Sequence, residues 1–109
     1  MNDANAVNDI ELLGFAAKAV GYWDKEFNCY NGPLSWDPLI DDADALRLAV
    51  TLRITVEIGE VVTGVHAGHL KDISYAMHNG DPFAATRRAI VEAAAEIGRT
   101  NVSYRTGRE

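Results

Sequence analysis

Hydrophobic residues recur every three or four positions near the start of the chain. The apolar positions between Asp9 and Val20 follow this spacing and predict a helix over residues 9–20 with one buried face. Asn8 or Asp9 can cap its start. Gly21 is the residue type expected directly after a helix C-terminus, so we expect the helix to end there.

A second apolar stripe predicts a helix over residues 42–52 that packs on a sheet. Asp41 is a natural N-cap, and Asp44 follows it at the spacing of a capping box. Carboxylates at the start of a helix stabilise its positive end by about 0.3–1 kcal/mol each. We therefore interpret the acidic residues of this segment as supports for the helix start.

An alanine-rich segment near the C-terminus predicts a third helix, over residues 82–97. Asp81 can cap it, and Pro82 suits the first helical position because the missing amide proton costs nothing there. Gly98 is expected to end this helix. Residues 99–109 lack apolar periodicity, and we expect the end of this tail to be mobile.

Between the second and third helices the hydrophobic period shortens from about 3.6 residues to about 2, which is typical of strands. The alternation predicts a strand over residues 54–58 and a second one over residues 61–66. Gly59-Glu60 can supply a two-residue turn between them, and Ala67-Gly68 a turn into a third strand. Neighbouring strands joined in this way form an antiparallel meander.

These elements define an α+β fold class. We expect an α/β sandwich in which an antiparallel sheet of about three to five strands packs with three helices. The length of 109 residues has room for one domain, spanning residues 1–109. The sheet residues expected to be largely buried are Ile54, Val56, Ile58, Val65, Ile73 and Tyr75, and Met77 is expected to share the inward row of the third strand.

Charge and composition restrict the partners of the chain. Ten basic and sixteen acidic residues leave a net charge of −6, so sequence-independent binding to duplex DNA is not expected. Residues 1–60 carry four basic and eleven acidic groups, and residues 61–109 carry six and five. No stretch approaches the ~18 apolar residues of a membrane helix. The N-terminus has no basic signal-peptide region, and the single cysteine, Cys29, fits a reducing cytosol.

No catalytic or metal-binding motif stands out. His66 and His69 would face each other across a hairpin, but no spaced thiol or carboxylate completes a zinc site, and we expect solvent-facing turn residues there. The acidic run between Asp37 and Asp44 lacks the alternation, glycine and distal glutamate of a calcium loop. A phosphate loop, a nucleophile elbow and an activating signature around Cys29 are also missing. We expect no enzyme activity, no cofactor and no metal.

Two features could recognise a ligand. Five aromatic residues lie between Tyr22 and Trp36, in a segment predicted to form one or two short irregular strands. Aromatic faces stack on bases, although core packing accounts for such a cluster as well. Two arginines in the second turn of the last helix could hold a phosphate or form a solvated helix face. The candidate ligand-binding residues are Arg87, Arg88, Trp23, Tyr30 and Trp36.

Two stretches of the chain resemble a known family. Residues 36–49 (WDPLIDDADALRLA) and 81–91 (DPFAATRRAIV) look like the two signature stretches of the phage ABA sandwich domain family. The resemblance covers about residues 12–99. It implies an α/β sandwich and a bacterial cytoplasm as the setting. It transfers no catalytic residue, because the family offers none that matches.

We therefore expect a small phage-encoded binding protein without catalysis. Our first hypothesis is an anti-defence sponge that sequesters a nucleotide-derived immune signal. The alternative is an interaction protein that inhibits or scaffolds a host or phage protein, and a third, weaker hypothesis is a hydrolase of such signals. A homo-oligomer, most simply a two-fold dimer, is expected because a short meander leaves a sheet edge and apolar surface uncovered.

Overall fold

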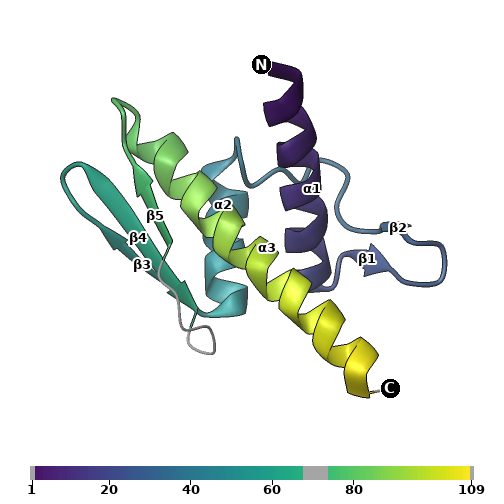
Figure 1. The fold of residues 1–109 in the computed structure, drawn as a ribbon. Coiled ribbons are helices and arrows are strands. Elements are labelled where there is room, and N and C mark those ends of the chain that lie inside the picture. The colour runs from purple at the N-terminus through teal and green to yellow at the C-terminus, as the bar shows by residue number, and fades with distance from the viewer. Residues whose placement is uncertain (1, 68–73, 109) are drawn as a thin grey trace.

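The computed structural model describes the backbone of residues 2–67 and 74–108, and the side chains of residues 8–67 and 74–100. These residues form an α+β fold with three helices, a two-stranded ribbon and a three-stranded sheet, so the predicted fold class is confirmed (Figure 1). The helices are α1 (Asn2–Val20), α2 (Asp42–Leu52) and α3 (Pro82–Arg108). The strands are β1 (Trp23–Asp24), β2 (Cys29–Tyr30), β3 (Ile54–Ile58), β4 (Val62–Ala67) and β5 (Ser74–Met77).

The helix starts and stops are set by capping residues in most cases. α1 ends as predicted, at Gly21, whose φ of 85° is easily adopted only by glycine. The same helix begins at Asn2, so the predicted cap at Asn8 or Asp9 is wrong. α2 has the predicted bounds, and the carboxylate of Asp41 accepts a hydrogen bond from the backbone N–H of Asp44 at 3.0 Å.

Helix α3 continues beyond its predicted end. Asp81 caps its start, where a carboxylate oxygen accepts from the backbone N–H of Ala84 at 3.0 Å. Gly98 does not stop the helix, which runs on to Arg108. A Cβ at Gly98 would overlap the carbonyl oxygen of Phe15 in α1. The glycine is therefore required for the close crossing of two helices rather than for a helix end.

The three-stranded sheet is antiparallel with the order β3-β4-β5, as predicted, but its registers differ. Ile58 pairs with Thr63, and the backbone N–H of Gly59 donates to the Val62 carbonyl at 2.8 Å. The two-residue turn is therefore residues 60–61, one position later than predicted. Alternation of polar and apolar residues indicates which residues share a face of a strand, but it does not fix the position of the turn.

The second predicted turn is also wrong. Ala67 belongs to strand β4, and Val65 pairs with Ser74 of β5. The inward row of β5 is therefore Ser74 and Ala76, which are half-buried. The predicted row was the opposite one, and its members Tyr75 and Met77 are 67% and 59% exposed. Ile73, predicted to share that row, lies outside the described residues.

The covered face of the sheet is formed by alternate residues of β3 and β4. Ile54 and Val65 are buried as predicted, and Val56 is half-buried and packs against the core. Ile58 shares their face but is 63% exposed, because it is the last residue of an edge strand. In Figure 1 the three helices lie to one side of this sheet.

α3 is the central element of the core, since it packs against α1, α2 and all three strands of the sheet. Half of the sixteen buried apolar residues in the described part of the chain come from α3 alone, and ten of the sixteen are alanines. Many large apolar side chains remain on the surface instead. Within the described part, no helix has the length and apolar character needed to cross a bilayer.

Candidate binding surface

Arg87 lies in the second turn of α3 and is held by two acceptors. Its Nε donates to the backbone carbonyl of Leu39 at 2.8 Å, and its Nη1 pairs with an Asp42 carboxylate oxygen at 2.6 Å. The Arg87 side chain is 18% exposed. The guanidinium therefore ties α3 to the segment that leads into α2, and two of its donor groups are already engaged.

Arg88 points away from Arg87, toward α1. Its Nη1 pairs with an Asp9 carboxylate oxygen at 2.7 Å, and its Nε with a Glu92 oxygen at 3.1 Å. The hydrogen bond that Arg88 donates to Asp9 is the main cause that raises the pKa of Arg88. Partial burial opposes this shift, and the negative charges of Asp9 and Glu92 add to it. The two predicted arginines thus do not converge on one site.

The acidic run before and within α2 serves local structure. One Asp37 oxygen accepts from the backbone N–H of Leu39 at 3.1 Å. Asp44 does not complete a capping box, because its Oδ2 accepts from the backbone N–H of Asp37 at 2.9 Å and its Oδ1 faces Arg47 at 3.4 Å. These carboxylates hold the loop before α2 in place.

Three of the clustered aromatic rings contact one another. Tyr22 stands edge-on to Tyr30 and to Trp36, with ring centroids 6.4 Å and 5.5 Å apart. Tyr30 and Trp36 are stacked, with centroids 5.9 Å apart and planes inclined by 19°. We call Tyr22, Tyr30 and Trp36 the aromatic triad. It combines two of the predicted ligand-binding residues, Tyr30 and Trp36, with one that the sequence did not single out.

A glycine closes one side of this triad. A Cβ at Gly32 would come within 2.6 Å of the Tyr30 hydroxyl and 2.7 Å of the Tyr22 ring, so only glycine fits. The Tyr30 hydroxyl donates to the carbonyl of Pro33, and the backbone N–H of Asn31 donates to the Tyr22 carbonyl. The loop after β2 is thereby fixed against the rings.

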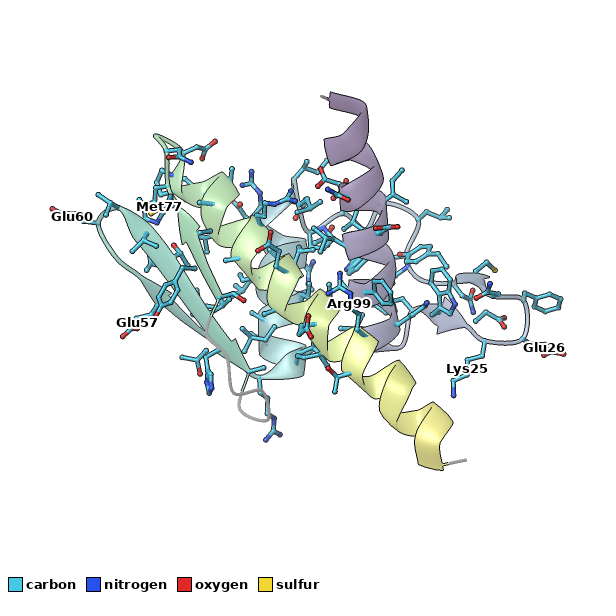
Figure 2. All side chains as sticks on the ribbon, in the orientation of Figure 1. Lys25, Glu26, Glu57, Glu60, Met77 and Arg99 are labelled. Carbon is cyan, nitrogen blue, oxygen red and sulfur yellow. The ribbon has the colours of Figure 1, made fainter. Side chains whose placement is uncertain are left out.

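Trp23, the remaining predicted aromatic, lies in a different environment. The Lys18 ammonium is 4.7 Å from the centroid of its ring, and its indole N–H donates to the Asn28 side chain at 3.3 Å. Lys25 and Glu26 project outward from the loop of the same ribbon (Figure 2). Trp23 is therefore not one of the rings in contact within the triad.

A buried polar group that the sequence did not reveal connects the sheet to α3. The Thr63 hydroxyl is 2.8 Å from His78 Nε2 and 2.8 Å from the Thr86 hydroxyl. Thr63 is fully buried and His78 is 7% exposed. Thr63 and His78 are as close to each other as a nucleophile and its general base. Thr63 is fully buried, however, so a substrate cannot reach its hydroxyl. Only the register of β4 and β5 brings these residues together, so sequence spacing carries no signal for them.

Other candidate chemistry is limited in the described residues. His66 is a half-buried residue of β4 opposite Thr55, so its predicted place in a turn is wrong, and His69 lies outside the described residues. Among the residues that the structure describes, no group of three or more His, Cys, Asp or Glu side chains could hold a metal ion. Cys29 is exposed and unbridged.

Comparison with known proteins yields no match. The chain matches no family model, no curated protein and no solved structure. The resemblance to phage ABA sandwich proteins therefore stays a prediction, and the function has to be argued from the residues themselves.

Proposed function

We propose that this chain is a small non-catalytic binding protein whose partner is another protein. The observation that carries this proposal is the distribution of apolar side chains between core and surface. The described core is built mainly of alanine, whereas twelve large apolar residues of the same described part are exposed. Large apolar side chains contribute most to protein interfaces when a partner covers them.

The exposed apolar residues lie on several elements. Leu46 and Val50 follow each other by one helical turn on α2 and are 63% and 68% exposed. On the sheet, Tyr75 and Met77 point away from the helices, next to Gly64 and Val62 of β4. Such surfaces favour a protein partner, because a small charged ligand gains little from them.

The arginine pairing supports the same choice over a nucleotide-derived ligand. A phosphate near Arg87 or Arg88 would have to displace Asp42, Asp9 or Glu92, or share a guanidinium with a carboxylate. Like charges at this distance repel each other, which weakens binding of an anion. The sponge hypothesis stays a prediction, and so does the setting in a bacterial cytoplasm, which is supported only by the family resemblance.

Self-association is part of this proposal. Strands β3 and β5 both form edges of the sheet, and the apolar residues Tyr75 and Met77 lie beside one of these edges. Open edges with flanking apolar residues pair readily with a second chain. A two-fold dimer would cover this surface.

In-cell photo-crosslinking tests the proposed function. A photo-reactive amino acid at Leu46, on the exposed apolar surface of α2, should give a covalent adduct with one protein. Mass spectrometry identifies that protein, and calorimetry with both purified components should give a saturable complex. A stoichiometric nucleotide released from the heated, purified chain would contradict the proposal and support the sponge.

A further inference from the structure

Strand β5 forms one edge of the three-stranded sheet, and its backbone groups alternate between two directions. The backbone N–H of His78 donates to the Val61 carbonyl at 2.9 Å, so His78 and every second residue before it face β4. The backbone N–H and C=O groups of Tyr75 and Met77 consequently point away from β4. Among the described residues, no partner binds these groups. This edge of the sheet can therefore pair with another extended chain.

The opposite edge, β3, is less suited to pairing. Glu57 of β3 is exposed and points away from the helices (Figure 2). A charged side chain is a common protection of edge strands, whereas β5 carries no charged side chain. A chain with a net charge of −6 meets a copy of itself with least repulsion where the contact is uncharged. The charge distribution therefore favours β5 as the contact between two copies.

The residues of β5 also fit a second copy of the same strand. In an antiparallel pair centred on Ala76, Tyr75 of each copy lies opposite Met77 of the other, so the outward backbone groups of both residues are paired. On the open face, each thioether then meets a phenol ring, and contacts between sulfur and aromatic rings are favourable. On the side of the helices, the central residue is a half-buried alanine, which leaves room for close approach.

We propose that β5 pairs antiparallel with β5 of a second copy, so that the two sheets join into one continuous sheet with Ala76 at the two-fold axis. This inference rests on the self-association within the proposed function and names the strand, the partner and the register. Leu46 and Val50 on α2 lie outside this contact, because α2 packs beside β3. A different protein can therefore bind α2 while the two copies are paired.

Disulfide trapping tests the register. In the proposed pair the two Ala76 residues lie opposite each other without mutual hydrogen bonds, at a Cα separation of about 4.5 Å that a disulfide can span. Ala76→Cys, combined with Cys29→Ser to remove the native thiol, should give a disulfide-linked dimer as the main species under mild oxidation. Thr55→Cys in the same background is the control. It places an exposed cysteine on β3 and should stay unlinked on a non-reducing gel.

Proline substitution tests the backbone contact. Tyr75→Pro removes an outward N–H, and an edge strand tolerates proline where the N–H points out of the sheet. Tyr75→Ala is the matched control, because it also removes the ring but keeps the N–H. Both copies lose a hydrogen bond with proline, so the dimer dissociation constant should be about tenfold or more above that of the alanine variant. Sedimentation equilibrium measures both constants, and circular dichroism compares the folds of the two variants.

The possible results separate this inference from the proposed function. A dimer whose Ala76→Cys form stays unlinked, or equal linking through Thr55→Cys, would overturn the pairing of β5 while self-association stands. Equal dissociation constants for the two Tyr75 variants would overturn it as well. A monomeric unmodified chain at micromolar concentration would overturn both the pairing and the proposed self-association. Crosslinking at Leu46 tests the contact with another protein independently, because Leu46 lies on α2.

Discussion

Gly98 of α3 lies directly against the backbone of Phe15 in α1, so closely that a single added methyl group would overlap the Phe15 carbonyl oxygen. The backbones of two helices cannot give way as the end of a flexible side chain can. The contact between these two residues therefore sets the distance at which α1 and α3 cross.

Gly98→Ala should lower the free energy of unfolding by about 1–3 kcal/mol, because overpacking forces the helices apart. Urea denaturation measures the change. Gly14→Ala is the matched control, since a Cβ there would meet Trp23 at an ordinary 3.9 Å. Alanine raises helix propensity by up to about 1 kcal/mol, so the control should be neutral or stabilising. Equal destabilisation by both substitutions would contradict the close crossing.

Thr63→Val should destabilise the fold by about 1–3 kcal/mol, because it removes the buried hydroxyl that both His78 and Thr86 contact. The shape of the side chain is kept, so the loss reports on hydrogen bonding. Thr55→Val, at an exposed position of β3, should change stability by less than about 0.5 kcal/mol. Thermal unfolding of both variants checks the prediction, and a neutral Thr63→Val would refute it.

Arg53→Gly should stabilise the protein. Arg53 caps α2 in the left-handed conformation with a φ of 58°, and its backbone N–H donates to carbonyls at the helix end. Glycine adopts this conformation without steric strain, and the net gain after its larger unfolded-state entropy is about 0.5–1 kcal/mol. Arg47→Gly, inside the same helix, should instead lose about 1 kcal/mol. Denaturant midpoints of the two variants should therefore move in opposite directions.

The Tyr30 phenol should ionise above its ordinary pKa of 10.0, because partial burial, then Tyr22, then Asp44 disfavour the phenolate. A pKa raised in the folded state contributes stability that is full below pH about 10 and is lost as the pH rises through the folded-state pKa. An ultraviolet titration follows phenolate formation. Tyr30→Phe should remove the phenolate signal that forms at the highest pH. Asp44→Asn should move this part of the titration to lower pH.

Light scattering at micromolar concentration should give twice the chain mass of 11.9 kDa. Met77→Lys places a charge on the open face of the sheet and should yield the monomer. Ser35→Lys, exposed in the loop between β2 and α2, adds the same single charge outside the sheet and is the control. A monomer of about 12 kDa in the unmodified chain would refute the predicted dimer.

The sequence predicted those parts of the fold that depend on local chemistry. Asp41 and Asp81 cap their helices, and Gly21 ends α1, because capping acts within one turn. The errors concern residues whose role depends on distant partners. Glycine is a residue type typical of helix ends, and only the close approach of α1 shows that Gly98 is needed for helix packing.

For the candidate site, the sequence predicted individual residues but not how their side chains are arranged. Tyr30 and Trp36 do lie together, because they are near in sequence and a glycine loop draws them close. The carboxylate partners of Arg87 and Arg88 come from α1, the start of α2 and the next turn of α3. Asp9 and Asp42 lie far from the arginines in sequence, so residue spacing along the chain could not predict these two ion pairs.

The place of α3 after all the other elements in chain order has a consequence for biosynthesis. A ribosome releases α1, α2 and the meander before it completes the helix that supplies half of the described buried apolar residues. Until α3 has left the exit tunnel, Ile54, Val65 and Ala16 have no surface to pack against. The described core therefore closes only after α3 has followed the other elements out of the ribosome.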